Sequence, residues 1–207
     1  MSDRVDLLKS LLRAAASRAG SELRRVAPLG AVRRALADAL AQRAAIGDDT
    51  LTAAVAHADG VRAASVTARG GAIQFDVVFA DARQLAAALV PLEPRFAPRG
   101  AKELRFRVEP PEAARDPRVA GVAAAVAGAV ARALWGVLVA GRDDAGAAIV
   151  DREGDELRVD LRTVPAVRRR VESRAPLGAV IDVMGLGALR AEDGRLTLEL
   201  SLPQLLR

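Results

Sequence analysis

The sequence lacks cysteine, tyrosine and asparagine, and aromatic residues make up only 2% of its 207 residues. Without a thiol it can form no disulfide and no thiolate metal site or nucleophile. His57 is the single histidine, and it stands in an alanine-rich stretch. A zinc site or a serine–histidine dyad would therefore depend on one residue. We predict a protein that is not an enzyme and that holds no metal and no cofactor.

Motifs for phosphate and calcium are also missing. The stretch "GLGAL" at 185–189 lacks the third glycine of a dinucleotide loop. Acidic residues gather between 143 and 156, but their spacing does not match a calcium loop, which needs oxygen ligands at alternate positions. We interpret these acids as solvated ends of turns.

Lysine is nearly absent, and the basic charge is concentrated in one segment. Residues 1–45 carry nine basic and four acidic side chains, which gives +5, and this equals the net charge of the whole chain. A basic segment can bind nucleic acid, but such surfaces usually add stacking aromatic residues. Residues 1–45 contain none, so the composition argues against a nucleic-acid partner.

The N-terminal segment reads as amphipathic helices. Apolar residues recur at helical spacing from 3 to 19, and a second helix begins near Pro28. Asp3 and Asp6 stand where a secretory signal carries positive charge, so we expect a cytoplasmic protein, either free or peripheral on the inner membrane face. The residues expected to touch a membrane or a partner are Leu8, Lys9, Leu11, Leu12 and Arg13.

The rest of the chain alternates between strand and helix patterns. Hairpins are expected at 61–80 around Gly70-Gly71, at 147–164 around Gly154, and at 179–202 around Asp193-Gly194. Residues 102–110 alternate as a half-buried strand. Short helices are expected at 50–58, at 81–92 and from Pro165. This order predicts an α+β fold with a largely antiparallel sheet and helices on one face.

Two domains are expected, a helical segment over 1–45 and a single α+β domain over 46–207. Within the second, "GGAIQFDVVFADA" and "GDELRVDLRTVPA" share a pattern at an offset of 84 residues. Phe75 corresponds to Val159 and Asp76 to Asp160. We interpret this as two pseudo-repeats, about 48–117 and 118–203.

The longest apolar stretch, 118–140, predicts a helix buried against the sheet. Valine and leucine cover one arc, and Gly121, Ala125, Gly128 and Arg132 cover the other. That sorting and the mid-helix arginine argue against a membrane span. The small residues are consistent with two arrangements, close packing against a neighbouring element or an apolar groove that holds a ligand. The candidate groove residues are Val119, Val122, Val126, Val130, Leu134, Phe96 and Phe106.

Two basic clusters follow the two short helices. One lies in "RFAPRGAKELRFRVEP" (95–110), where Arg99 and Lys102 are expected to project from a loop, and the other lies in "AVRRRVESRAPLG". Beside an apolar interior they would suit the headgroup of an anionic amphiphile. The candidate rim residues are Arg95, Arg99, Lys102, Arg168 and Arg169.

The pattern resembles the tubular lipid-binding (TULIP) superfamily, in particular its small bacterial members. The features that carry the resemblance are "VRAASVTARGGAIQFDVVF", the helix 118–140, and the C-terminal stretch from "LRVDLRTVPAVRRR" to "LTLELSLP". They cover roughly residues 48–203 without a diagnostic motif. The resemblance implies a curved antiparallel sheet with the helix on its concave face, and phospholipid as ligand.

Two functions follow as expectations. The first is a non-enzymatic lipid- or amphiphile-binding protein with an apolar groove, a basic rim and contact with an anionic membrane surface. The second is a structural or protein-interaction module without a ligand, in which residues 1–45 pair with a partner or a second copy. A filled interior favours the second function, and an open cavity beside Arg99 or Arg169 favours the first.

Overall fold

The computed structural model describes residues 43–97, 100–135, 148–173 and 185–201. Its first half comprises β1 (Arg43–Gly47), α3 (Asp48–Ala56), β2 (Val61–Arg69), β3 (Ala72–Phe79), β4 (Gln84–Pro91), β5 (Arg95–Phe96), β6 (Lys102–Glu109) and the 3₁₀ helix η1 (Pro111–Arg115). Its second half comprises α4 (Pro117–Trp135), β7 (Val150–Glu153), β8 (Glu156–Asp160), η3 (Leu161–Thr163), α5 (Pro165–Ser173), β9 (Gly185–Glu192) and β10 (Arg195–Ser201).

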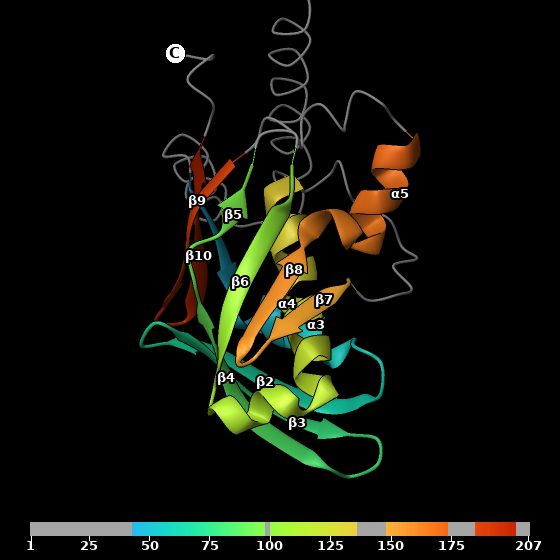
Figure 1. The fold of residues 1–207 in the computed structure, drawn as a ribbon. Coiled ribbons are helices and arrows are strands. Elements are labelled where there is room, and N and C mark those ends of the chain that lie inside the picture. The colour runs from blue at the N-terminus through green and yellow to red at the C-terminus, as the bar shows by residue number, and fades with distance from the viewer. Residues whose placement is uncertain (1–42, 98–99, 136–147, 174–184, 202–207) are drawn as a thin grey trace, which may run out of the picture. The chain divides into compact units, whose positions relative to one another are not determined.

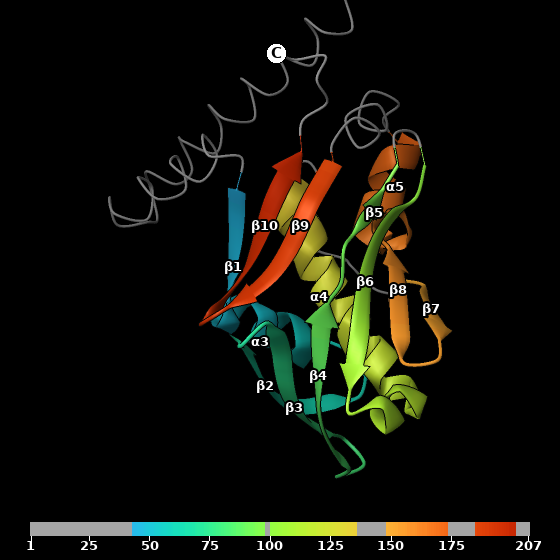
Figure 2. The ribbon, with the colours of Figure 1, turned by 60° about the vertical axis from the view of Figure 1, so that its left-hand side comes forward.

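The strands form two antiparallel sheets. The larger follows the order β2-β3-β4-β6-β8-β7, with β5 paired to β6, and the smaller follows β1-β10-β9. The large sheet is curved and unclosed (Figure 1), and α4 passes behind β4 and β6 in Figure 2. The predicted α+β fold, with a largely antiparallel sheet and a long apolar helix on one face, is confirmed.

The predicted hairpins form where glycine permits the turn. Gly70 and Gly71 have φ of 59° and 83°, between β2 and β3. Two successive residues at positive φ are the geometry of the tight turn that suits twisted antiparallel strands. Gly154 and Gly194 also have positive φ, at the β7–β8 and β9–β10 turns.

Helix α3 is tied to β2 by its polar side chains. Asp48 Oδ1 accepts a hydrogen bond from Ala68 N at 2.9 Å, and Thr52 Oγ1 accepts one from Val66 N at 3.0 Å. Leu51 and Val55 are fully buried below it. The helix predicted over 50–58 is present, but it begins and ends two residues earlier than predicted. The exposed His57 is its C-terminal cap.

The core is continuous between α4 and the sheet. Its fully buried members include Val119, Val126 and Val130 of α4, together with Phe106 of β6 and Val159 of β8. Burying such a side chain stabilises the fold by roughly 1.5–3 kcal/mol. Gly121, Ala125 and Gly128 are only half-buried and Arg132 is exposed. The predicted division of this helix into a buried valine arc and a small-residue arc is confirmed.

Two predicted elements are wrong. Residues 84–91 form strand β4, between β3 and β6, where a helix was predicted over 81–92. Residues 43–45 belong to β1, where the helical N-terminal segment was predicted to extend to 45. The remainder of that segment, 1–42, and the end of the predicted long helix, 136–140, lie outside the described residues.

The two proposed repeats match in part. In each, a helix precedes a hairpin whose second strand buries the corresponding residues, Ile73 and Phe75 in β3, and Leu157 and Val159 in β8. After the hairpin they differ, because β3 continues into strand β4 whereas β8 continues into η3 and α5. The pseudo-repeat stays a prediction for the helix and hairpin alone.

Candidate functional site

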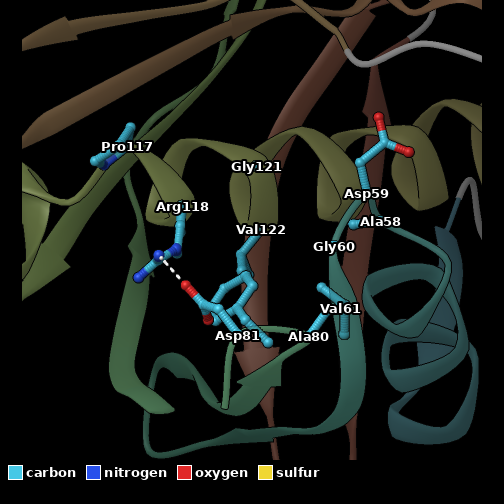
Figure 3. Close-up of a pocket in the computed structure, with 11 residues that line it drawn as sticks. Ala58, Asp59, Gly60, Val61, Ala80, Asp81, Pro117, Arg118, Gly121 and Val122 are labelled. Atoms are coloured by element: carbon cyan, nitrogen blue, oxygen red, sulfur yellow. Dashed lines mark hydrogen bonds and ion pairs between the residues drawn. The ribbon is translucent and has the colours of Figure 1, made fainter. Parts of the chain in front are cut away.

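A pocket of about 450 Å³ opens beside the first turns of α4 (Figure 3). We call it the α4 pocket. Its volume lies within the range of small-molecule sites. It is lined mainly by backbone and apolar side chains from the α3–β2 turn, from the end of β3 with the turn that follows, and from α4. The lining residues are Ala58, Asp59, Gly60, Val61, Phe79, Ala80, Asp81, Pro117, Arg118, Gly121 and Val122.

Local sequence fixes the α4 wall of this pocket. Asp116 precedes the helix, and its Oδ1 accepts a hydrogen bond from Arg118 N at 2.9 Å. Proline at the first helical position needs no donor there, so Asp116-Pro117 is a favourable start for a helix. This start sets Arg118, Gly121 and Val122 on consecutive turns along the pocket wall.

The opposite wall is held by backbone hydrogen bonds between two turns. Ala80 N donates to Gly60 O at 2.8 Å, and Val61 N donates to Ala58 O at 3.2 Å. Gly60 has φ of 74°, which favours glycine at this turn. The α3–β2 turn and the end of β3 therefore form one backbone unit facing α4.

Arg118 is the one cation of the lining, and three groups hold it. Its Nη2 lies 2.8 Å from Asp81 Oδ2, and its Nη1 lies 3.8 Å from Asp116 Oδ2. Its guanidinium carbon lies 4.9 Å from the centre of the Phe79 ring, the geometry of a cation–π contact. Figure 3 shows the bond to Asp81 across the mouth of the pocket.

Gly121 faces open space. A Cβ built on it would meet no atom within 4 Å, so the pocket begins directly at the helix backbone. Gly128, two turns later, would place a Cβ 3.8 Å from Arg132 Nη2, which is ordinary contact. The small-residue arc of α4 therefore contributes to a cavity at Gly121.

A second pocket, of about 380 Å³, lies among charged residues of β5, β6 and β8. We call it the Arg–Glu pocket. It is lined by Glu93, Pro94, Arg95, Glu103, Arg105 and Arg158. Beside it Glu156 accepts two hydrogen bonds from Arg105, at 2.6 and 2.9 Å, and one from Arg158 at 3.0 Å. These bonds, the one from Arg105 foremost, lower the pKa of Glu156 to about 2. Arg158 also pairs with Glu153.

The predicted groove residues are mostly packed. Val119, Val126, Val130 and Phe106 are fully buried in the core, while Leu134 and Phe96 are half-buried. Val122 is the member of this set that lines the α4 pocket. Packed side chains thus fill the space between helix and sheet where the groove was predicted. The pocket lies instead beside the N-terminal part of the helix.

Lys102 does not project from a loop as predicted. It is the first residue of β6, and its side chain is only 1% exposed. Its Nζ donates to Ala97 O at 3.0 Å and lies 5.6 Å from the centre of the Phe96 ring. In the alternating pattern of β6, position 102 is in phase with Leu104 and Phe106, so its side chain points inward.

The other predicted rim residues are not at the α4 pocket. Arg95 is exposed and lines the Arg–Glu pocket, and Arg168 and Arg169 are exposed on α5. Arg99 lies outside the described residues, as do the predicted membrane or partner residues Leu8, Lys9, Leu11, Leu12 and Arg13. The α4 pocket therefore has a different rim, formed by Asp59, Asp81 and Arg118.

Sequence reasoning missed the α4 pocket because its walls come from three separated segments. The available signals were local ones. Asp59-Gly60 marks a turn, Asp116-Pro117 marks a helix start, and Gly121 is a gap in an alanine- and valine-rich helix. The spacing of these residues in the sequence does not indicate that the three segments lie together in the fold.

Neither a metal centre nor a fully buried long helix is found in the described ranges. No group of three or more His, Asp or Glu side chains among them is arranged to hold a metal ion. The segment Pro117–Leu134 is long and apolar enough to cross a membrane by length and composition, and half of it is buried inside the fold.

Comparisons with protein-family models, with curated proteins and with solved structures gave no match for this chain. The resemblance to tubular lipid-binding proteins therefore stays a prediction from the sequence pattern.

Proposed function

We propose that this chain is a non-enzymatic protein that binds a lipid or another small amphiphile in the α4 pocket. The observation that carries the proposal is the pocket itself, which combines a ligand-sized volume, an apolar floor at Phe79 and Val122, and a few charged groups at its mouth. An apolar lining with few polar groups is the usual composition of a small-molecule site.

The position of the pocket on a long helix supports the same reading. The backbone at Gly121 is open to the cavity, so an aliphatic chain can lie against the helix without moving a side chain. In this proposal the basic residues of 1–45 attract the protein to an anionic membrane surface, at about 1 kcal/mol for each well-placed residue. The membrane would then be the source of the ligand.

The test is native mass spectrometry of the purified full chain, with organic extraction and lipid analysis of the same sample. Gly121→Leu places a side chain in the open space of the pocket, and we expect it to remove the co-purifying amphiphile. Leucine also favours a helix over glycine by up to about 1 kcal/mol, so the variant should melt no lower than the natural chain.

Gly121→Ala and Gly128→Ala form a matched pair of controls. Both raise helix propensity equally, and both have room for the added methyl group. We expect both to retain the bound mass. A clean apo mass for the natural chain, or the same adduct in Gly121→Leu, would contradict binding in this pocket.

A second candidate function is the protein-interaction module. It is favoured by the packing of Val119, Val126 and Val130, which leaves the helix–sheet interface filled. Under this alternative the native spectrum contains no small-molecule adduct and shows a defined oligomer or a protein partner.

A further inference from the structure

The mouth of the α4 pocket carries more negative than positive charge. Its lining contains the carboxylates of Asp59 and Asp81 and a single cation, Arg118, which gives a formal charge of −1. Two groups just outside the lining, Asp116 at 3.8 Å from Arg118 and Arg83 at 3.6 Å from Asp81, add one charge of each sign and leave this balance unchanged. The rim expected from the sequence was basic, so these groups favour a different ligand from the anionic amphiphile expected there.

Arg118 is poorly placed to receive an anion. Its guanidinium already pairs with Asp81, lies near Asp116 and covers the face of Phe79. An anionic headgroup would have to displace Asp81 from Arg118 and would leave that carboxylate with only its longer contact to Arg83, at 3.6 Å, beside a new negative charge. Both effects oppose binding.

Asp59 is placed to receive a cation. Its side chain is exposed at the α3–β2 turn, and among the described residues it forms no ion pair or hydrogen bond. Figure 3 shows it on the far side of the pocket from Arg118, with its carboxylate turned away from the Arg118–Asp81 pair. A positive group can therefore pair with Asp59 while Arg118 and Asp81 stay together.

We propose that the α4 pocket selects a cationic amphiphile, with an ammonium group at Asp59 and an aliphatic chain along Gly121, Val122 and Phe79. This inference rests on the proposed function, since it names the ligand class of the same pocket. The ring face of Phe79 is occupied by Arg118, so the aromatic ring contributes apolar contact and the carboxylate contributes the charge recognition.

The test compares three probes of equal chain length, dodecylamine, dodecanol and dodecanoate, by titration calorimetry on the full chain at concentrations where each probe is a dissolved monomer. We expect dodecylamine to bind most tightly and dodecanoate most weakly. Asp59→Asn should weaken dodecylamine by about two- to fivefold, the range for one exposed charge pair, and leave dodecanol unchanged.

Asp151→Asn is the control for the loss of one carboxylate. Asp151 is exposed on β7 and does not line the pocket, so its removal should change no affinity. Gly121→Leu should weaken all three probes by roughly tenfold or more, because it removes the space for about two methylene groups.

The outcomes separate the two proposals. If all three probes bind, lose affinity in Gly121→Leu, and show no preference for the amine, the pocket is an amphiphile site and the cation inference is wrong. Tighter binding of dodecanoate than of dodecylamine also overturns it. If no probe binds, or if Gly121→Leu changes nothing, the proposed function fails together with the inference.

Discussion

The α4 pocket and the Arg–Glu pocket are similar in size and opposite in construction. The first has an apolar floor and one ion pair between its lining residues, that of Arg118 with Asp81. The second is lined mostly by charged side chains, and two of its arginines, Arg105 and Arg158, are linked through Glu156. A cavity among side chains that bond to one another is a stabilising surface network. A cavity whose floor has no polar partner to offer is suited to an aliphatic ligand.

The largest expected effect is on the stability of the fold, through the packing of α4 against the sheet. Val126→Asp places a carboxylate at a fully buried position of α4. An unpaired buried charge costs several kcal/mol, so we expect the domain to unfold or to be insoluble. Circular dichroism with thermal melting checks this. A soluble variant with a cooperative melt near that of the natural chain would show that the valine arc is not the packed face.

A smaller effect is expected in the Arg–Glu pocket, and it depends on pH. The pKa of Glu156 is lowered to about 2 by Arg105 and Arg158, below the ordinary value of 4.5. Its stabilising contribution is therefore complete above about pH 4.5 and is lost as the pH falls through about 2. Glu156→Gln should cost about 1 kcal/mol at neutral pH and should flatten this acid dependence.

Denaturant titrations between pH 2 and pH 7 measure that difference. Glu112→Gln serves as the control, since Glu112 is an exposed carboxylate on η1 away from either pocket. If the natural chain and Glu156→Gln lost stability in parallel below pH 4.5, the bonds of Glu156 to Arg105 and Arg158 would contribute nothing measurable to stability.

The smallest stability effect is expected at the mouth of the α4 pocket. Arg118→Met keeps an apolar stem over Phe79 and removes the pair with Asp81, whose side chain is 48% exposed. Pairs of this exposure contribute about 0–1 kcal/mol, so the melting temperature should change little. Asp81 would keep only its longer contact with Arg83, at 3.6 Å, and the pocket lining would lose its one positive charge, so dodecylamine should bind more tightly. Weaker dodecylamine binding in this variant would assign the ligand contact to Arg118.

The sequence was most informative where a local pattern had one structural solution. Gly70-Gly71 between two alternating segments predicted a hairpin, and β2 and β3 form it. Pro165 predicted the start of a helix, and α5 begins there. It was misleading at β4. Leu85 and Leu89 are four residues apart, a spacing that places both on one face of a helix and also on one face of a strand. Pairing with β3 and β6 decided between them.

Lys102 shows how charge can obscure a correct pattern. The alternation that identified Leu104, Phe106 and Val108 as buried extends back to position 102, so the sequence contained the signal. The positive charge and the neighbouring Pro98 and Gly100 suggested a projecting loop residue instead. The inward position of Lys102 is possible because its Nζ donates a hydrogen bond to the carbonyl of Ala97. The position of that carbonyl cannot be inferred from the sequence. The α4 pocket was out of reach for the same reason, because three distant segments have to meet.

The position of α4 in the chain also has a consequence during synthesis. The helix packs against α3 and η1, which precede it, and against β7, β8 and η3, which follow it. The later partners begin some fifteen residues after Trp135, at Val150. Until those residues leave the ribosome, one side of an apolar helix long enough to span a bilayer has nothing to cover it. We therefore expect chains truncated before Val150 to aggregate or to associate with membranes, and the rate of translation through 136–160 to influence how much of the protein folds.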